Sequence, residues 1–301
     1  MKAESGSPHS KKAGAACINL ILRGGRPILT SEVEVCSVVH VMLAPRKIKP
    51  DWWKTEVNKL GDAVLHAPWA RPELTRREVD FVFRFLHPAE GKRLLDSGCG
   101  FGRHSLLLSE AGISVVGIDV AHSLLRIGSR RAKARGLPVA FSRSDAANMP
   151  FMDESFDCVI SMAEGGIGYQ DDDPSNERIL AEIARVLRPC GKFIIETINA
   201  GWAEKHCPRT KFQLDSSAAA CYHFSYNRSI SRLTTRVWSF LPRRLRFLRS
   251  AGSVRLYAFP EMTAILERLG LDIWNSYGST TEAEPFSSKS FRMVLLGAKR
   301  E

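Results

Sequence analysis

A carboxylate and three glycines stand within seven residues of one another. Asp96 ends a short apolar segment and is followed by Gly98, Gly100 and Gly102. The leucines of residues 106–108 then begin a segment with the pattern of a helix. A carboxylate and exposed backbone N–H groups therefore meet at the carboxyl end of a predicted strand, where open α/β sheets bind their ligands.

The spacing of these glycines argues against two common nucleotide-binding loops. A P-loop requires Gly-Lys-Ser/Thr, but Arg103 and His104 follow Gly102. The dinucleotide fingerprint G-x-G-x-x-G requires a third glycine where Arg103 stands. Asp96 would also repel a diphosphate, whereas it would attract a cation. The pattern favours a ligand that carries an ammonium group and no phosphate, such as S-adenosylmethionine.

Two further acidic residues follow the next two predicted strands. Asp119 lies 21 residues after Gly98 and can accept hydrogen bonds from both hydroxyls of a ribose, or it caps the next helix. Asp145 can accept a hydrogen bond from the exocyclic amine of adenine, or it serves a turn. The order of glycine loop, ribose acid and adenine acid at successive strand ends favours an adenosyl ligand.

The elements that must position these residues alternate between strand and helix patterns. Strands are predicted at residues 93–96, 114–119, 139–143, 156–162 and 192–197. Helices are predicted at residues 73–86, 103–111, 123–135 and 177–187, the last preceded by Asp173 as N-cap and Pro174 in the first turn. The short connections predict an α/β fold with a doubly wound, Rossmann-like, mostly parallel sheet.

Residues 201–257 break this alternation, because arginines there alternate with aromatic and β-branched residues. The pattern predicts antiparallel strands, which form a β-rich insertion after strand five. A helix at 260–269 and two strands at 271–277 and 291–298 follow, and the last strand is expected to run antiparallel. The main domain is expected to span residues 51–301.

The first fifty residues differ from the rest of the chain. Residues 1–14 are small and polar, so residues 1–50 are expected to form a poorly ordered extension. The apolar residues 15–22 are few and lack a clear small-residue cleavage site, which argues against a signal peptide. One hypothesis places the natural start near Met42, with residues 1–41 extra.

The bulk composition limits the class of protein. The formal net charge of +11 indicates either a polyanionic partner, such as nucleic acid, or a soluble surface rich in arginine, and the wide spread of the charge favours the surface. Seven scattered cysteines without a C-x-x-C pair favour a reducing cytoplasm over a zinc site or disulfides. No apolar run approaches the ~20 residues of a membrane span, so no membrane partner is expected.

Five segments resemble the class I S-adenosylmethionine-dependent methyltransferases of the small-molecule type. They are residues 95–102, 115–119, 145–151, 156–161 and 185–193. The two closing strands are similar to the carboxyl-terminal antiparallel hairpin of that family. Cys190 departs from the family, which usually has glycine there, on a turn away from the cofactor. The resemblance implies S-adenosyl-L-methionine as the cofactor, and methyl transfer from it requires no metal.

The resemblance also implies a role for individual residues. At the glycine loop, the expected cofactor-binding residues are Asp96, Ser97, Gly98, Cys99, Gly100 and Gly102. Asp119 would bind the ribose, with Val120 against the adenine, while Asp145 and Ala146 would bind the adenine edge. Met162, at the end of strand four, would lie along the cofactor near its sulfonium.

Substrate groups are expected from the loop after strand four. Glu164 is a candidate general base or an anchor for a substrate amine, unless it caps a turn. Tyr169 would orient the nucleophile or shape the pocket, unless it only packs. His104 either contacts the ligand or only begins a helix. The tryptophans that would close the other side of the pocket, or pack in the core, are Trp52, Trp53 and Trp69.

The leading hypothesis is methyl transfer to a nitrogen, oxygen or carbon atom of a small molecule, with residues 201–257 as a lid over the substrate. The sulfonium is already activated, so the enzyme supplies alignment, exclusion of water and, where needed, a base. An RNA methyltransferase is the first alternative, supported by the charge and by residues 222–255, but no Asn/Asp-Pro-Pro-aromatic motif follows strand four. A non-catalytic binding protein of the same fold is the second alternative. The acidic residues at the expected cofactor-binding positions, Asp96, Asp119 and Asp145, argue against this alternative.

Overall fold

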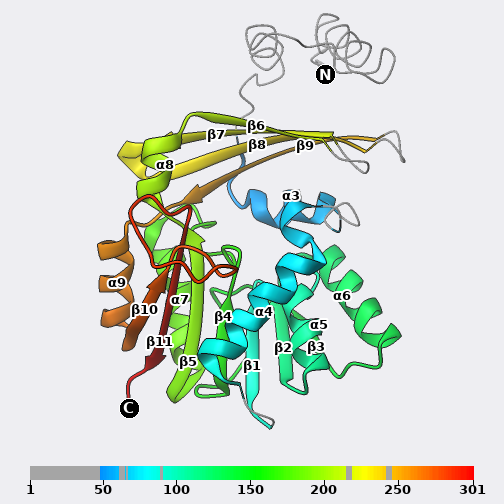
Figure 1. The fold of residues 1–301 in the computed structure, drawn as a ribbon, viewed down its shortest axis with the longest axis vertical. Coiled ribbons are helices and arrows are strands. Elements are labelled where there is room, and N and C mark those ends of the chain that lie inside the picture. The colour runs from blue at the N-terminus through cyan, green and yellow to red at the C-terminus, as the bar shows by residue number, and fades with distance from the viewer. Residues whose placement is uncertain (1–47, 61–64, 66, 89–90, 215–218, 242–245) are drawn as a thin grey trace, which may run out of the picture. The chain divides into compact units, whose positions relative to one another are not determined.

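The computed structural model describes residues 48–60, 65, 67–88, 91–214, 219–241 and 246–301 (Figure 1). The expectations for residues 1–47, including a start near Met42, lie outside the described residues. No helix in the part of the chain that the structure describes is long and apolar enough to cross a membrane.

A seven-stranded sheet forms the centre of the fold. In spatial order its strands are β10 (Leu271–Tyr277), β11 (Arg292–Lys299), β5 (Leu187–Ile198), β4 (Phe156–Ser161), β1 (Arg93–Ser97), β2 (Ser114–Asp119) and β3 (Ala140–Arg143). Strands β1 to β5 pair in parallel, whereas β11 runs antiparallel to both β5 and β10. The predicted doubly wound, mostly parallel sheet with an antiparallel last strand is confirmed.

Helices cover both faces of this sheet. The helices that pack on the sheet are α4 (Pro72–Leu86), α5 (Arg103–Glu110), α6 (His122–Ala134), α7 (Asp173–Val186) and α9 (Phe259–Arg268), whereas α3 (Trp52–Leu60) contacts α6 and the later strand β9 (Arg246–Arg255). Phe193 and Ile195 of β5 pack in one core with α7 and α9, while Ile194 packs in the other with α4 and α5. This alternation follows from the two-residue period of a strand and explains why β5 is apolar on both sides.

The region around α7 and β5 departs from the predicted boundaries. The helix begins at Asp173, and its N-cap is Asp172, whose side chain accepts a hydrogen bond from the Ser175 N–H at 2.8 Å. The predicted assignment of Asp173 as N-cap is therefore wrong by one residue. Strand β5 begins at Leu187 rather than Lys192, because Leu187 already pairs with β4 before a shift in register.

A second sheet of four antiparallel strands follows β5, as expected for the insertion. Its strands are consecutive, β6 (Arg209–Leu214), β7 (Ala219–Asn227), β8 (Arg232–Leu241) and β9 (Arg246–Arg255). The expectation of strands throughout residues 201–257 is wrong at its start, where helix α8 (Ala200–His206) lies. The Asn199 side chain caps this helix by accepting a hydrogen bond from the Gly201 N–H at 3.0 Å. Trp202, within the helix, is buried. We call residues 209–255 the inserted sheet.

Candidate active site

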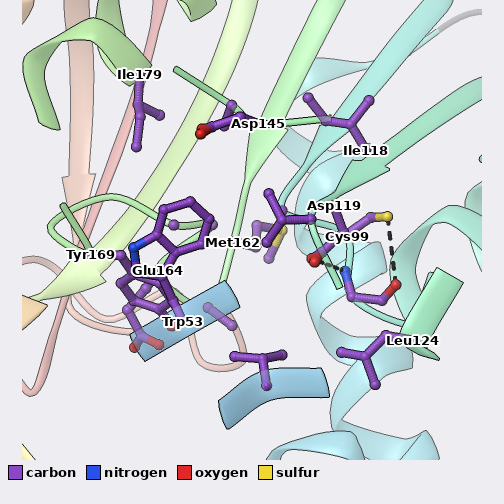
Figure 2. A pocket seen from close by; sticks show the side chains of 18 of the residues that line it. Trp53, Cys99, Ile118, Asp119, Leu124, Asp145, Met162, Glu164, Tyr169 and Ile179 are labelled. Atoms are coloured by element: carbon purple, nitrogen blue, oxygen red, sulfur yellow. Dashed lines mark hydrogen bonds between the residues drawn. The ribbon is translucent and has the colours of Figure 1, made fainter. Parts of the chain in front are cut away.

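A cavity of about 330 Å³ opens where β1, β2, β3 and β4 end (Figure 2). Asp119 and Cys99 lie together on one side of it, and Glu164 and Tyr169 lie together on another. We call the first side the glycine-loop wall and the second the Glu164 wall. The cavity lies where the sequence predicts a ligand site, at the carboxyl ends of parallel strands.

The glycine-loop wall depends on a close approach between two loops. Gly98 has a φ of 72°, and a Cβ there would lie 2.6 Å from the backbone of Gly165. Glycine is therefore required at this turn. The Cys99 N–H donates to the Ile118 carbonyl at 2.9 Å, which ties the loop to β2. Of the predicted loop residues, Gly98, Cys99 and Gly100 line the cavity.

Three predicted loop residues are not among those that line the cavity. The Asp96 carboxylate is buried and accepts a hydrogen bond from the Ser105 hydroxyl at 2.6 Å. Burial raises the pKa of Asp96 above its usual value. Ser97 is also fully buried, and Gly102 packs against the ring of Phe141 at the start of α5. These three residues support the loop from behind.

Asp119 lines the cavity with both carboxylate oxygens engaged by backbone groups. One oxygen accepts from the Gly100 N–H at 2.8 Å and the other from the Ala121 N–H at 2.7 Å. Burial raises the pKa of Asp119, although these donors act against the increase. Ala121, not Asp119, occupies the N-cap position of α6. Since each carboxylate oxygen has two lone pairs, one on each remains for a ligand hydroxyl.

Asp145 lines the cavity and also serves a turn. Its carboxylate accepts a hydrogen bond from the Ala147 N–H at 3.0 Å, as in an Asx turn. Ala146 and Val120 lie in the cavity lining beside it, as does Met162 at the end of β4. The structure thus brings together all of these predicted residues, and the turn role of Asp145 accompanies its place in the cavity.

On the Glu164 wall, Glu164 is held by an arginine that sequence reasoning missed. Arg292, at the start of β11, forms an ion pair with Glu164, and its Nε lies 3.7 Å from a carboxylate oxygen of Glu196. Burial alone would lower the pKa of Arg292, but these two carboxylates raise it. The sequence does contain a signal for this residue, because Arg292 is a charged residue at the start of a strand whose next four residues are apolar.

The loop that carries Glu164 has an unusual backbone. Ala163 and Glu164 have φ values of 51° and 73°, in the left-handed region that costs a non-glycine residue about 1–3 kcal/mol. Glu196 stabilises this conformation, because its side chain accepts from the Ala163 N–H at 2.7 Å and its carbonyl from the Glu164 N–H at 3.2 Å. Strained residues of this kind cluster at functional sites.

Aromatic side chains complete the Glu164 wall. The ring of Tyr169 lies 5.0 Å from that of Trp52, measured between centroids. Burial and the nearby Glu164 carboxylate raise the pKa of Tyr169, so its hydroxyl stays protonated. Trp52, Trp53 and Trp69 all line the cavity, and Trp69 lies beside Phe101 of the glycine loop, with ring centroids 6.3 Å apart.

Residues 94–191 match the model of a methyltransferase domain. The chain is 42% identical over 122 residues to the demethylmenaquinone methyltransferase of Thermus thermophilus. It is 35% identical over 112 residues to the ubiquinone biosynthesis O-methyltransferase of Rhizobium etli. These matches cover 40% and 37% of this chain, and 51% and 43% of those proteins, so the chain spans about half the length of the curated relatives it matches.

Two solved structures share the fold over most of the chain. An S-adenosylmethionine-dependent methyltransferase from Clostridium acetobutylicum has a TM-score of 0.68 at 13% identity, covering 81% of this chain and 97% of its own. The CcbJ methyltransferase from Streptomyces caelestis has a TM-score of 0.68 at 16% identity, covering 82% and 99%. The chain carries a class I S-adenosylmethionine-dependent methyltransferase domain. The predicted family and its cofactor are confirmed.

In this methyltransferase domain, a buried charge cluster supports the start of α5. Glu78 of α4 forms an ion pair with Arg103, and the Nε2 of His104 lies 3.0 Å from a Glu78 oxygen. Burial would raise the pKa of Glu78, but His104 and Arg103 lower it to about 2. Arg103 and His104 both line the cavity. His104 therefore lies at the ligand cavity while it is bound to a structural carboxylate.

The inserted sheet contacts the segments that form the Glu164 wall, on the side of those segments that faces away from the cavity. Among the described residues, the cavity lining includes none from 201–257. Instead, the Arg255 N–H donates to the Gly168 carbonyl at 2.7 Å, and the Arg232 guanidinium donates to the Gln170 carbonyl at 3.0 Å. On the other side, the Trp52 indole donates to the Ser253 carbonyl at 3.1 Å. The inserted sheet thus touches both segments that make the Glu164 wall.

Proposed function

We propose that this protein transfers a methyl group from S-adenosyl-L-methionine to a nitrogen, oxygen or carbon atom of a small molecule by in-line displacement. The observation that carries the proposal is a single cavity with two chemically different walls. The glycine-loop wall offers hydrogen-bond acceptors for an adenosyl group, and the Glu164 wall offers a carboxylate and aromatic rings. The matched family model and the names of the curated relatives support the same chemistry.

The glycine-loop wall fits the cofactor by its donor and acceptor set. In the proposed arrangement Asp119 accepts the two ribose hydroxyls, using the lone pair left on each oxygen. The Gly98 turn, where a Cβ would collide, leaves room for the methionine part. Asp145 and Ala146 bind the adenine edge, with Val120 against its face. Asp96, Ser97 and Gly102 hold the loop in place.

The Glu164 wall provides the catalytic groups of the proposed reaction. When bound, the cofactor supplies a methyl carbon whose bond to sulfur breaks as the acceptor's lone pair bonds to that carbon, the sulfur keeping the electron pair. Glu164 accepts the proton that the acceptor releases, and Arg292 orients its carboxylate. Tyr169, kept neutral by burial and by the Glu164 carboxylate, donates its O–H to Glu164 and orients the acceptor through its hydroxyl oxygen, which accepts a hydrogen bond. The tryptophans exclude water.

The inserted sheet has a supporting part in this proposal. It closes the acceptor side as a lid that acts through other elements, because it holds Trp52 on one side and the Gly168 and Gln170 carbonyls on the other. Residues 51–301 then work as one catalytic domain. Changes in the inserted sheet are expected to alter acceptor binding more than cofactor binding.

The test combines two measurements. Isothermal titration with S-adenosylmethionine is expected to show binding at one site. Radiolabelled methyl transfer is then measured against a small-molecule metabolite extract and against total RNA, and label is expected in the small molecules. Label confined to RNA would make the RNA methyltransferase alternative correct. Absence of cofactor binding would favour the non-catalytic alternative.

A further inference from the structure

Glu196 of β5 carries a buried carboxylate beside the Glu164 wall. The residue is 3% exposed and lies outside the described lining of the cavity. One of its carboxylate oxygens accepts a hydrogen bond from the Ala163 N–H at 2.7 Å, and the other lies 3.7 Å from the Nε of Arg292. Burying a carboxylate is unfavourable unless it is paired and hydrogen-bonded. Glu196 therefore depends on Arg292 as well as on the loop that carries Glu164.

The strand register explains why Glu196 and Arg292 meet. Arg292 of β11 pairs with Ile198 of β5 in antiparallel register, and Glu196 lies two residues before Ile198. Residues two apart on a strand point to the same face, so Glu196 and Arg292 are diagonal neighbours on one face of the sheet. The same guanidinium reaches Glu164 through Nη1 and lies nearest Glu196 with its Nε. Arg292 is therefore shared between two carboxylates.

The charges around Glu164 come from several elements. Besides Arg292 of β11 and Glu196 of β5, the titratable groups near it are Tyr169, which donates its O–H to Glu164, and Asp119, which acts on Tyr169. Arg292 supplies the positive charge of this group. Its side chain is 21% exposed, so most of it is removed from water.

The shared arginine matters when Glu164 takes up a proton. With both carboxylates ionised, Glu164, Glu196 and Arg292 together have a net charge of −1, and one proton on Glu164 makes the three neutral. Without Glu196, the same proton would leave Arg292 with no carboxylate partner in this group. Leaving one charge of a largely buried pair without its partner is unfavourable. The second carboxylate therefore makes proton uptake by Glu164 easier.

We propose that Glu196 is a positioning residue that keeps Arg292 paired while Glu164 takes up the proton of the methyl acceptor. Glu196 also holds the Ala163 N–H, so the loop that presents Glu164 to the cavity keeps its conformation in both protonation states. This inference rests on the proposed function, in which Glu164 is the base, and it adds the residue that lets Glu164 change its charge.

The first experiment is a double-mutant cycle on the stability of the protein. Glu164→Gln imitates the protonated side chain, and Glu196→Gln keeps an oxygen for the Ala163 N–H but removes the charge. Each single variant leaves Arg292 one carboxylate, whereas the double variant leaves none. The folding equilibrium constant, measured by denaturant unfolding, is expected to fall in the double variant about tenfold further than the product of the two single effects.

A double variant whose effect equals that product overturns the inference. A double variant that does not fold, while both single variants do, supports it.

The second experiment measures kcat against pH with radiolabelled S-adenosylmethionine and the metabolite extract. Since protonated Glu164 cannot act as a base, kcat should fall at low pH. Glu196→Gln is expected to move the midpoint of this fall to lower pH by about one unit, because removing a neighbouring negative charge disfavours proton uptake. Above the midpoint, kcat is expected to fall about threefold, as for a weaker base.

Two further variants separate the charge of Glu196 from its structural role. Glu182→Gln is the matched control, because Glu182 accepts from the Met149 N–H at 2.6 Å and forms an ion pair with Arg185, but lies outside the described lining of the cavity. This variant should leave the midpoint unchanged. Glu196→Asp keeps the charge, so it should keep the wild-type midpoint.

An unchanged midpoint in Glu196→Gln overturns the inference and leaves methyl transfer intact. No label with the wild-type protein overturns the proposed function, and the inference with it. If Glu196→Gln does not fold, Glu196→Asp decides the question. The wild-type midpoint in Glu196→Asp supports the inference, whereas a midpoint at lower pH, with the charge still present, overturns it.

Discussion

The two walls of the cavity are built in different ways. The glycine-loop wall comes from consecutive strand ends, and backbone N–H groups hold the carboxylate of Asp119. The Glu164 wall gathers residues from α3, from the loop after β4 and from β11, and an ion pair between Glu164 and Arg292 joins positions 128 residues apart. One wall is thus a property of local chain geometry, and the other is a product of long-range side-chain contacts.

This difference predicts separable effects. Changes on the glycine-loop wall should alter cofactor affinity, and changes on the Glu164 wall should alter the rate or the acceptor affinity. If variants of one wall changed the cofactor affinity and the acceptor affinity by equal factors, the division of the cavity into a cofactor wall and an acceptor wall would be wrong.

The largest effect is expected from Glu164→Gln. The amide keeps the shape of the side chain but cannot accept a proton, so kcat should fall by about 10²–10⁴-fold, as for loss of a general base. The Kd for S-adenosylmethionine, measured by titration, should not change. Glu267→Gln, on the exposed surface of α9, is the control. An unchanged kcat would leave Glu164 as an anchor for the acceptor and not as the base.

Glu78→Gln tests whether the glycine-loop wall also depends on an ion pair. The change leaves Arg103 buried without its carboxylate, which should lower the free energy of unfolding at pH 7 by about 3 kcal/mol. Because the folded pKa of Glu78 is lowered to about 2, the carboxylate stabilises fully above pH 4.5 and loses this effect as the pH falls toward 2.

Denaturant unfolding of wild type and Glu78→Gln at several pH values gives this difference directly. The gap between the two proteins should narrow as the pH falls below 4.5. A gap independent of pH would mean that the charge of Glu78 contributes nothing to stability.

Asp119→Ala is expected to weaken cofactor binding by about 1–3 kcal/mol, because two hydrogen bonds to a charged group are lost. Isothermal titration measures the effect, and Asp80→Ala, at an exposed position of α4, provides the comparison. Affinity equal to that of the wild type would remove Asp119 from the cofactor site.

The smallest effect is expected from Gly252→Ala in the inserted sheet. A Cβ at this position would lie 2.6 Å from the indole ring of Trp52, so the ring must shift. The acceptor concentration that half-saturates the rate should rise about threefold, as for a mildly overpacked contact. Ser250→Ala, two residues earlier on β9, should change neither the half-saturating acceptor concentration nor the Kd for S-adenosylmethionine. A change in cofactor affinity alone would show that the inserted sheet serves the glycine-loop wall.

Much of the fold could be predicted from periodicity and punctuation in the sequence. The helices predicted at 73–86, 103–111, 123–135 and 260–269 are confirmed to within one residue at each end. The pattern failed where a tertiary contact decided the outcome: Leu187 joins β5 because it pairs with Phe156 of β4. Helix α8 was missed because its one-sided burial of Trp202 spans only seven residues.

The amino-acid sequence alone determined the parallel sheet, the methyl donor and most of the glycine-loop wall. These depend on short-range patterns, since a glycine turn or a carboxylate at a strand end takes its meaning from its immediate neighbours. Only the tertiary structure placed Arg292 on Glu164 and set the inserted sheet behind the Glu164 wall. Those contacts join residues far apart in the chain, and no local spacing encodes which charge or donor will meet a partner once the strands are packed.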